Sequence, residues 1–574
     1  MRAYVAMLEP PGPPPPWFVE LRAAPPAAWA VRTMGPVNVF QPVERTDPLR
    51  PVFGGVVLGE VFPRLGRSSP DQELRLLRPQ AAARRLTRDA FGAHVVIGRD
   101  PETGEAVVFR APGGGLDAVV WRRDGVLVAA SAAPDWLDAT LPAELAIDWD
   151  QAAALAGRPV LQSGAVALRG LAGLAPGEIW IEGRRDPLWR PADFAAPGRD
   201  PGRADPQALV AVVDHAVRAE AEGLCLLELS GGLDSAIVGG SLAAAGAAVQ
   251  AVNYAGAEAE GDERAFAQAA ADRFGFELQV VEKPAGAIDL AALSRVSGGF
   301  RPGRNGFDHH HDAYVAARAR ALGARTLMTG QGGDHVFFQA PTPLIAADGL
   351  GRGLTLALAA AIARWQGVSI YRLVREGLIA RLARGRPAPR LEPHLSEAAR
   401  AQARSAPEHP WLLGLGDLPP AKRLQAESLA HALNVQGTSL RGEAARLSHP
   451  LLSPPVIEQA LGVAVIDLVQ GGRDRGLARD AFAERLPAVI AARHGKGRLT
   501  GLYGRSLARS LPDLRPLLLE GELAGAGIID AAILDGALDA QAFLWRGGFG
   551  QVINLLMLEL WVRAWTARLS RLRS

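Results

Sequence analysis

Residues 227–240 have the sequence LELSGGLDSAIVGG, an apolar run that leads through a glycine-rich loop into a second apolar stretch. This pattern predicts a buried strand, a tight loop and a helix, whose first N–H groups form a binding site for an anion. Glycine lets a phosphate come close to the backbone, and Ser230 and Ser235 supply hydroxyl donors. Asp234 would repel a bare phosphate, so its presence indicates a bridging Mg²⁺.

The same six residues, SGGLDS, could instead form an ordinary tight turn in which Asp234 caps the helix. A P-loop with a lysine is disfavoured, because the pattern GxxxxGK[ST] does not occur in this chain. Two glycines, two hydroxyls and a carboxylate between a strand and a helix favour nucleotide binding over the simple turn.

Strands and helices alternate on both sides of this loop. The predicted elements are a helix over 207–222, a strand over 224–230, a helix from 234, a strand over 249–255, a helix over 262–275, a strand over 277–282, a helix over 311–323 and a strand over 324–330. Such alternation predicts an α/β fold with a doubly wound parallel sheet. Beyond Thr342 the pattern is almost entirely helical to the end of the chain.

The first 195 residues have a different pattern, with short Val- and Ala-rich segments separated by Gly, Pro and Asp turns, which predicts a β-rich domain. Strands are expected at 93–100, 105–111, 116–125, 126–133 and 177–183. Pro, Gly and charged residues then accumulate after residue 185. We therefore predict two domains, residues 1–197 and residues 198–574, which also suits a chain of 574 residues.

Composition excludes several classes of function. A net charge of +2 gives no basic excess for holding a nucleic-acid backbone. A single cysteine, Cys225, excludes an internal disulfide framework and a metal site built from several cysteines. The N-terminal residues lack the uninterrupted apolar core of a signal peptide, and no apolar stretch is long enough to span a membrane, so we expect a cytoplasmic protein without a membrane partner.

Several segments resemble one enzyme family. SGGLDS resembles the PP-loop of the ATP pyrophosphatases, which split ATP into AMP and pyrophosphate, and TGQGGDHVFF at 329–338 resembles the second signature loop of the asparagine synthetases. The segments at 98–109 and 168–183 resemble, in the expected order, that family's class II glutamine amidotransferase domain. Three C-terminal segments also resemble the family: HPLLSPPVIEQAL (449–461), RGLARDAFAERLP (475–487) and ARHGKG (492–497).

This resemblance implies ATP and Mg²⁺ as cofactors. The implied ATP-binding residues are Leu229, Ser230, Gly231, Gly232, Asp234, Ser235, Gly330 and Gly332. Asp234 and Asp334 are expected to hold the Mg²⁺, because they follow two parallel strands, where ligands of doubly wound sheets bind. Lys496 is expected to be catalytic and to neutralise charge that develops during the reaction.

The chain departs from the family at positions that bear on the source of nitrogen. A glutaminase of this class uses an N-terminal cysteine, but residue 2 is Arg2, so the N-terminal domain is degenerate and hydrolysis of glutamine by that chemistry is excluded. Gln331 stands where asparagine synthetases carry a glutamate, and a glutamine cannot act as a general base. We therefore expect the attacking amine to belong to the substrate itself.

Two branches of the family take the amine from their own substrate, the β-lactam synthetases and the lasso-peptide macrolactam synthetases (cyclases). The loop GQGGD and the C-terminal segments resemble the cyclases most. This resemblance implies that ATP adenylates an Asp or Glu side chain of a precursor peptide and that the peptide's N-terminal amine closes an isopeptide-bonded ring. The implied partners are a leader peptidase and a leader-recognition protein.

Three candidates remain for the acceptor side of the reaction. Glu443 is a candidate general base, and Gln331 and His309 are candidate residues of the substrate pocket. The run FDHHHDAY at 307–314 is interpreted as polar lining of a substrate channel or as a helix cap, because adjacent histidines on a helix point in different directions and cannot share one metal ion. The alternatives to a cyclase are an asparagine synthetase-like or β-lactam synthetase-like ligase acting on a small molecule, and a scaffold without activity.

Overall fold

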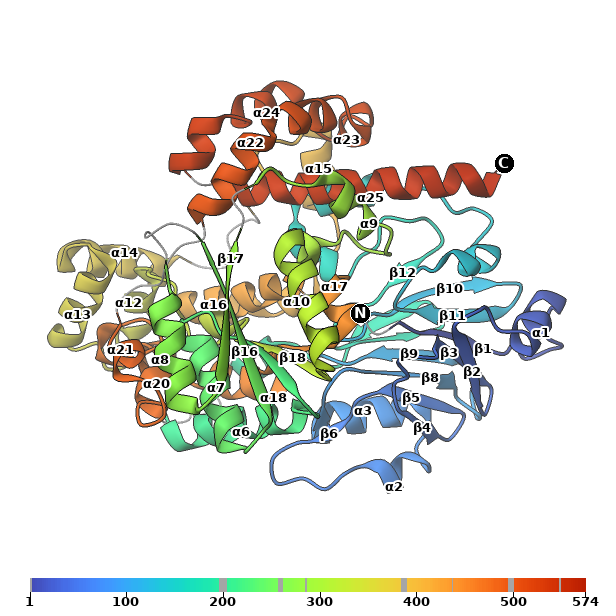
Figure 1. The fold of residues 1–574 in the computed structure, drawn as a ribbon, viewed down its shortest axis with the longest axis horizontal. Coiled ribbons are helices and arrows are strands. Elements are labelled where there is room, and N and C mark those ends of the chain that lie inside the picture. Colours follow the sequence, from blue (N-terminus) through green and yellow to red (C-terminus); the bar gives the residue numbers. More distant parts are fainter. Residues whose placement is uncertain are drawn as a thin grey trace.

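The computed structural model describes residues 3–195, 204–256, 262–283, 286–383, 390–435, 437–493, 500–546 and 549–573 (Figure 1). We call residues 3–195 the N-terminal sandwich and residues 204–573 the C-terminal part. The predicted boundary between residues 197 and 198 lies outside the described residues.

The N-terminal sandwich consists of two antiparallel six-stranded sheets. The first has the order β12-β10-β11-β1-β3-β2, with β12 Ala172–Gly173, β10 Val119–Arg123, β11 Val126–Ala130, β1 Val5–Leu8, β3 Val37–Pro42 and β2 Trp29–Met34. The second has the order β14-β13-β9-β8-β5-β4, with β14 Arg184–Pro187, β13 Glu178–Ile181, β9 Ala106–Arg110, β8 His94–Arg99, β5 Gly55–Gly59 and β4 Leu49–Val52. The pair β6 Phe62–Pro63 and β7 Ala90–Phe91, and the helices α1 Pro16–Ala23, α2 Asp71–Leu74, α3 Pro79–Asp89, α4 Trp149–Gly157 and α5 Ala192–Ala195, complete this part.

The apolar runs of the sandwich are continuous because its second sheet is covered on both faces. In β8, Val95 and Ile97 belong to the core between the two sheets, whereas Val96 packs with Leu86 of α3 on the other face. Successive side chains of a strand point to opposite faces, so both sets must be apolar. The predicted β-rich N-terminal part is confirmed, and all five predicted strands are present as β8, β9, β10, β11 and β13.

The C-terminal part is built on a five-stranded parallel sheet in the order β17-β16-β15-β18-β19. Its strands are β15 Cys225–Glu228, β16 Val249–Gly256, β17 Glu277–Lys283, β18 Thr326–Thr329 and β19 Arg446–Ser448. The predicted doubly wound sheet is thus confirmed. The expectation of an almost entirely helical chain beyond Thr342 is confirmed, and the exception is β19, whose three residues, Arg-Leu-Ser, are too short and polar to show a strand pattern.

The order of the strands places the ligand site. Numbered by sequence, the strands run 3-2-1-4-5, so the direction of winding reverses between β15 and β18. In open parallel sheets, ligands bind outside the carboxyl ends of the strands at such a reversal. The loop after β15 is the SGGLDS loop and the loop after β18 is the GQGG loop, so both signature loops lie at the reversal.

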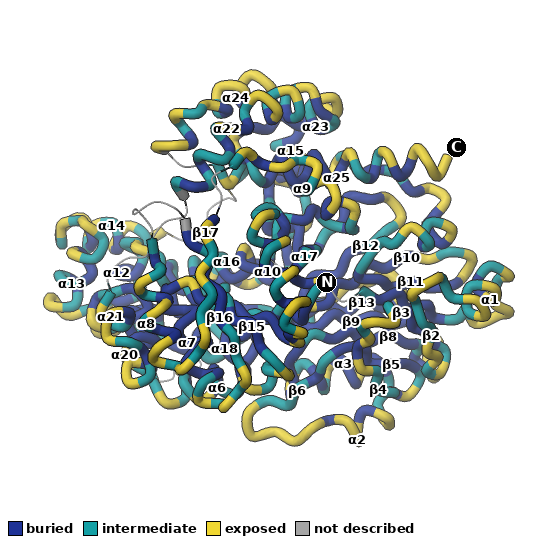
Figure 2. The backbone as a smooth tube through the Cα atoms, in the orientation of Figure 1, coloured by how far each residue is buried: buried dark blue, intermediate teal, exposed yellow. Residues whose placement is uncertain are grey.

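Helices cover the sheet and continue into the helical C-terminal part (Figure 1). Those among the strands are α6 Pro206–Glu220, α7 Leu233–Ala244, α8 Arg264–Phe274, α9 Leu290–Arg295 and α10 His309–Leu322. Those that follow are α11 Gly333–Val336, α12 Leu344–Gly349, α13 Leu356–Gln366, α14 Ile370–Leu382, α15 Glu397–Ser405, α16 Pro420–Ala432, α17 Leu440–Ala444, α18 Pro454–Gly462, α19 Val465–Leu468, α20 Gly476–Ala481, α21 Ala488–Ala491, α22 Thr500–Leu519, α23 Glu522–Gly525, α24 Ala531–Ala537 and α25 Phe549–Arg573. Figure 2 shows β15 as buried and the outer helices α14 and α24 as largely exposed.

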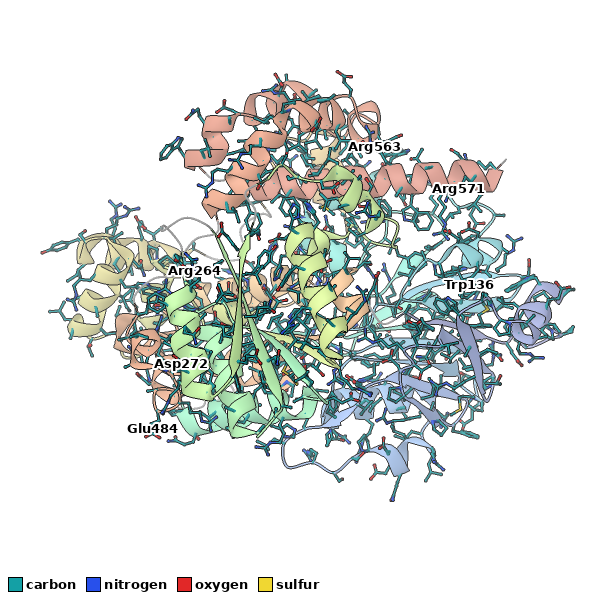
Figure 3. The ribbon with its side chains drawn as sticks, in the orientation of Figure 1. Trp136, Arg264, Asp272, Glu484, Arg563 and Arg571 are labelled. Carbon is teal, nitrogen blue, oxygen red and sulfur yellow. The ribbon has the colours of Figure 1, made fainter. Side chains whose placement is uncertain are left out.

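The last helix, α25, ties the two parts together. It crosses beside the N-terminal sandwich, where Arg563 and Arg571 mark its course and Trp136 lies below it (Figure 3). The Nε2 of Gln162 donates to Oδ1 of Asn554 on α25 at 2.7 Å, and Arg568 donates to the carbonyl of Ala133 at 2.7 Å. None of the helices in the described ranges is long and apolar enough to cross a membrane.

Candidate functional site

The SGGLDS loop has the strand–loop–helix form that the sequence predicts. It leaves β15 at the buried Leu229 and enters α7 through Gly231, which has a φ of 84°, and Gly232, which is the N-cap. A Cβ on Gly231 would lie 2.7 Å from the carbonyl oxygen of Glu263, so only glycine fits there. The hydroxyls of Ser230 and Ser235 are 3.1 Å apart and hydrogen-bond within the loop, which holds the N–H groups at the start of α7 in place.

The GQGG loop lies directly on the SGGLDS loop. A Cβ on Gly330 would be 2.3 Å from the backbone nitrogen of Ser235, and one on Gly333 would be 2.6 Å from Cγ of Asp234. Gly332 has a φ of 89°, and a Cβ there would be 2.3 Å from the side chain of Leu452. These glycines allow the backbones of two loops, about a hundred residues apart in sequence, to share one site.

Three charged side chains meet behind these loops. The Nη1 of Arg475 is 2.8 Å from Oδ2 of Asp234, and its Nη2 is 2.6 Å from Oδ2 of Asp474. Arg475 is itself buried and has a φ of 53°, which is unusual for a residue with a side chain. Burial lowers the pKa of Arg475, but the carboxylates of Asp234, Asp474 and Asp334 outweigh it and raise the pKa above its ordinary value.

The pair Asp234 and Asp334 suits Mg²⁺. Both carboxylates act on the same guanidinium of Arg475, and 43% of the Asp334 side chain is exposed and accessible to a ligand. Within the described residues there is no cluster of three or more His, Cys, Asp or Glu side chains that could hold a metal alone. Mg²⁺ is usually bound by one or two carboxylates together with substrate phosphates, so two carboxylates beside an anion-binding loop fit this ion.

Arg475 was not predicted from the sequence as a site residue. It lies in the segment 475–487 that carried part of the resemblance, but its partner Asp234 is 241 residues away. The signal that could have found it is the density of charge in RDRGLARD, because buried arginines are found paired with carboxylates. Arg479 supports the same cluster, with Nη2 at 3.1 Å from Oδ2 of Asp474.

Lys496 lies outside the described residues. Arg493, which flanks it in sequence, is described: its Nη2 is 2.9 Å from Oε1 of Glu263, and its guanidinium lies 4.0 Å from the ring centre of Phe266. Glu263 is the residue whose carbonyl contacts Gly231 of the SGGLDS loop. The catalytic role of Lys496 stays a prediction.

A second polar cluster lies at the end of β15, two residues before the SGGLDS loop. Arg441 of α17 donates from Nη1 to Oε1 of Glu228 at 2.6 Å and from Nε to Oδ1 of Asp312 at 2.9 Å. Burial raises the pKa of Glu228, but Arg441 and His311 outweigh it and lower the pKa below its ordinary value. Glu228 is thus an ionised, half-buried carboxylate at the ligand-binding edge of the sheet.

The three predicted acceptor-side residues differ in their burial and in their hydrogen bonds. Glu443 follows Arg441 by two residues on α17, so its side chain points away from that cluster and is exposed. Gln331 is half-buried in the GQGG loop, where its N–H donates to Oγ1 of Thr329 at 3.1 Å. His309 is the first residue of α10, and its Nε2 is buried without a hydrogen-bond partner among the described residues. None of these three roles is tested, and they stay predictions.

Lys283, at the end of β17, is the centre of a third cluster. It forms an ion pair with Asp308, and its Nζ lies 3.2 Å from the hydroxyl of Tyr503 on α22. That hydroxyl donates to Oδ2 of Asp308 at 2.8 Å. Together with Glu228, these residues line the carboxyl edge of the sheet from β15 to β17 with titratable groups.

A cavity of about 120 Å³ lies between the N-terminal sandwich and the C-terminal part. Its described lining includes Asp117 and Arg301, which form a bidentate ion pair across the interface at 2.6 and 2.9 Å, and His449 next to β18. Cys225 is not part of that lining; it is buried in β15, and burial raises the pKa of its thiol.

Comparison with known proteins agrees with this architecture. Residues 207–563, more than half of the chain, match the protein family described as asparagine synthase. No curated protein matches the sequence. The match spans the parallel sheet, both signature loops, the Arg475 cluster and most of α25. The chain therefore belongs to the asparagine synthase family, whose members are ATP-dependent, AMP-forming carbon–nitrogen ligases that typically use Mg²⁺.

Proposed function

We propose that this chain is a macrolactam synthetase that adenylates an Asp or Glu side chain of a precursor peptide and joins it to the peptide's own N-terminal amine. The observation that carries the proposal is the position of the one cysteine. Cys225 is buried in the middle of a parallel sheet with a raised thiol pKa, so it cannot serve as the nucleophile that releases ammonia from glutamine.

The cavity between the two parts supports the same proposal. Its described lining contains paired charges, glycines and hydroxyls, but the chain offers it no thiol. Without a thiol, this cavity cannot generate ammonia by the glutaminase route. A ligase that cannot release ammonia from glutamine needs another source of amine, and an amine group of the substrate itself meets this need.

The activation step is assigned to the two signature loops. The N–H groups at the start of α7 hold phosphate oxygens, and Asp234 and Asp334 would hold Mg²⁺, which supplies charge neutralisation on the leaving pyrophosphate. The carboxylate of the substrate attacks the α-phosphorus of ATP, so a carboxyl–phosphate bond forms while the bond to pyrophosphate breaks. Holding the activated carboxyl and the amine of one peptide together makes amide closure effectively unimolecular.

The test incubates the protein with ATP, Mg²⁺ and synthetic peptides encoded by short reading frames beside its gene. The proposal predicts peptide-dependent release of AMP and pyrophosphate and a product lighter than the peptide by one water. An N-acetylated copy of each peptide serves as the control, because it still offers its carboxylate but has no free amine. AMP release with aspartate and ammonium, and none with peptides, would instead indicate a small-molecule ligase.

A further inference from the structure

Of the three consecutive histidines at the start of α10, one faces the end of β15. His310 is exposed, and the ring of His309 lies against it, with ring centres 4.0 Å apart and ring planes tilted by 41°. His311 points the other way, with its Nε2 3.6 Å from Oε2 of Glu228 and its ring 4.9 Å from that of Tyr254 at the end of β16. His311 therefore lies between the ends of two central strands, and its neighbour Glu228 precedes the SGGLDS loop by two residues.

Two carboxylates near His311 in α10, those of Asp308 and Asp312, are held in place by their contacts. Asp308, the N-cap residue, is held by Lys283 and by the hydroxyl of Tyr503. Asp312 is buried, and its carboxylate accepts from the backbone nitrogens of Leu440 at 2.6 Å and Arg441 at 3.1 Å. These contacts fix this turn of α10 and so hold the backbone of His311 in place beside the ends of β15 and β16, as a catalytic group requires.

The neighbouring charges also determine which ring nitrogen of His311 carries the proton. Oε2 of Glu228 lies 3.6 Å from Nε2, beyond hydrogen-bond distance, but its negative charge favours the proton on that nitrogen and leaves Nδ1 to accept another. Burial lowers the pKa of His311, so the imidazole is neutral at pH 7, while the pKa of Glu228 is lowered and the carboxylate is charged. A neutral imidazole with a charged carboxylate beside one ring nitrogen is the arrangement that lets a histidine act as general base through the other nitrogen.

We propose that His311 is the general base of the amide-forming step, with Glu228 as its positioning residue; this deepens the proposed function and rests on it. The amine nitrogen attacks the carbonyl carbon of the acyl adenylate and forms the C–N bond. Nδ1 of His311 takes the proton that the nitrogen must lose, and the C–O bond to AMP breaks with its electron pair on the phosphate oxygen. Glu228 stabilises the imidazolium until the proton passes to water.

The two half-reactions separate this proposal from the proposed function. Adenylation is followed as ATP–pyrophosphate exchange that depends on the encoded peptide, and amide formation as the product that lacks one water. In His311→Gln, we expect exchange to remain within about twofold of wild type and ring closure to fall by about 10²–10⁴-fold, the usual contribution of a general base. Hydroxylamine, an unprotonated nucleophile at neutral pH, should trap the adenylate of the N-acetylated peptide equally well in both proteins.

The matched control is His431→Gln on α16, because His431 is an exposed histidine that no step of the proposed mechanism uses, so both half-reactions should stay unchanged. Ring closure by His311→Gln at the wild-type rate would overturn the role of His311 and leave the proposed function standing. Loss of exchange in His311→Gln would also overturn it, since the histidine would then serve adenylation or folding. Absence of peptide-dependent exchange in the wild-type protein would overturn the proposed function itself, and this proposal with it.

Discussion

Arg475 provides a quantitative test of how the SGGLDS loop is anchored to the rest of the C-terminal part. The exposed fraction of its side chain is 2%, and it pairs with Asp234 at 2.8 Å and Asp474 at 2.6 Å, both of which are also buried. In Arg475→Met the side-chain volume is nearly kept and the charge is lost. Asp474 keeps Arg479 at 3.1 Å, so Asp234 bears most of the loss.

Removing one partner of a buried ion pair costs about 3–5 kcal/mol, because an uncompensated charge stays buried. We therefore expect the free energy of unfolding of Arg475→Met to fall by about that amount, measured by equilibrium urea denaturation at pH 7. Arg473→Met is the control: this arginine is two residues away and 28% exposed, and its surface pair with Asp480 is worth about 0–1 kcal/mol. A loss in Arg475→Met no larger than in the control would refute the assignment of Arg475 as the buried link.

Four further outcomes are expected. Asp334→Asn should lower AMP formation by about 10²-fold or more, since a metal ligand contributes several kcal/mol to the transition state; unchanged turnover would remove Asp334 from the metal site. Gly330→Ala should lower it by about 10²-fold, because its Cβ would lie 2.3 Å from the backbone of the SGGLDS loop, whereas Gly416→Ala, with no atom within 4 Å, should be neutral. The lowered pKa of Glu228 means that its ionised form stabilises the protein above pH about 4.3 and that this contribution is lost as the pH falls. Glu228→Gln should therefore lower the free energy of unfolding by about 1.5–3 kcal/mol at pH 7 and by progressively less in acid. A difference in unfolding free energy that does not change with pH would contradict the ion pair. Cys225→Ala should keep full activity and cost about 1 kcal/mol of stability, and an inactive but folded variant would show that the thiol is used.

The signature loops could be predicted from the sequence because their information is local. Glycines, hydroxyls and a carboxylate lie within six residues between an apolar strand and a helix, and the structure has that strand, loop and helix. The alternating pattern likewise predicted the parallel sheet. What anchors the SGGLDS loop could not be predicted in the same way, because Arg475 and Asp234 meet across 241 residues and no periodicity connects them.

The acceptor-side residues likewise depend on packing that the sequence does not reveal. On α17, Glu443 and Arg441 are two residues apart, and a helix turns its side chains by about 200° over that distance. The choice between them depends on which face packs against β15, which the sequence of a five-residue helix does not specify. Glu228 gave a usable local signal, a charged residue inside the apolar run LCLLEL, since charged residues are rarely buried without a partner.

The most direct test of the central claim follows the oxygen atoms of the peptide carboxylate. The precursor peptide is labelled with ¹⁸O in its Asp and Glu side chains and incubated with the protein, ATP and Mg²⁺, and the AMP is examined by mass spectrometry. Adenylation followed by amide closure transfers one carboxylate oxygen to the α-phosphate, so the account predicts AMP carrying one ¹⁸O and a ring that has lost one. Label in inorganic phosphate instead of AMP, or unlabelled AMP beside a closed ring, would contradict it.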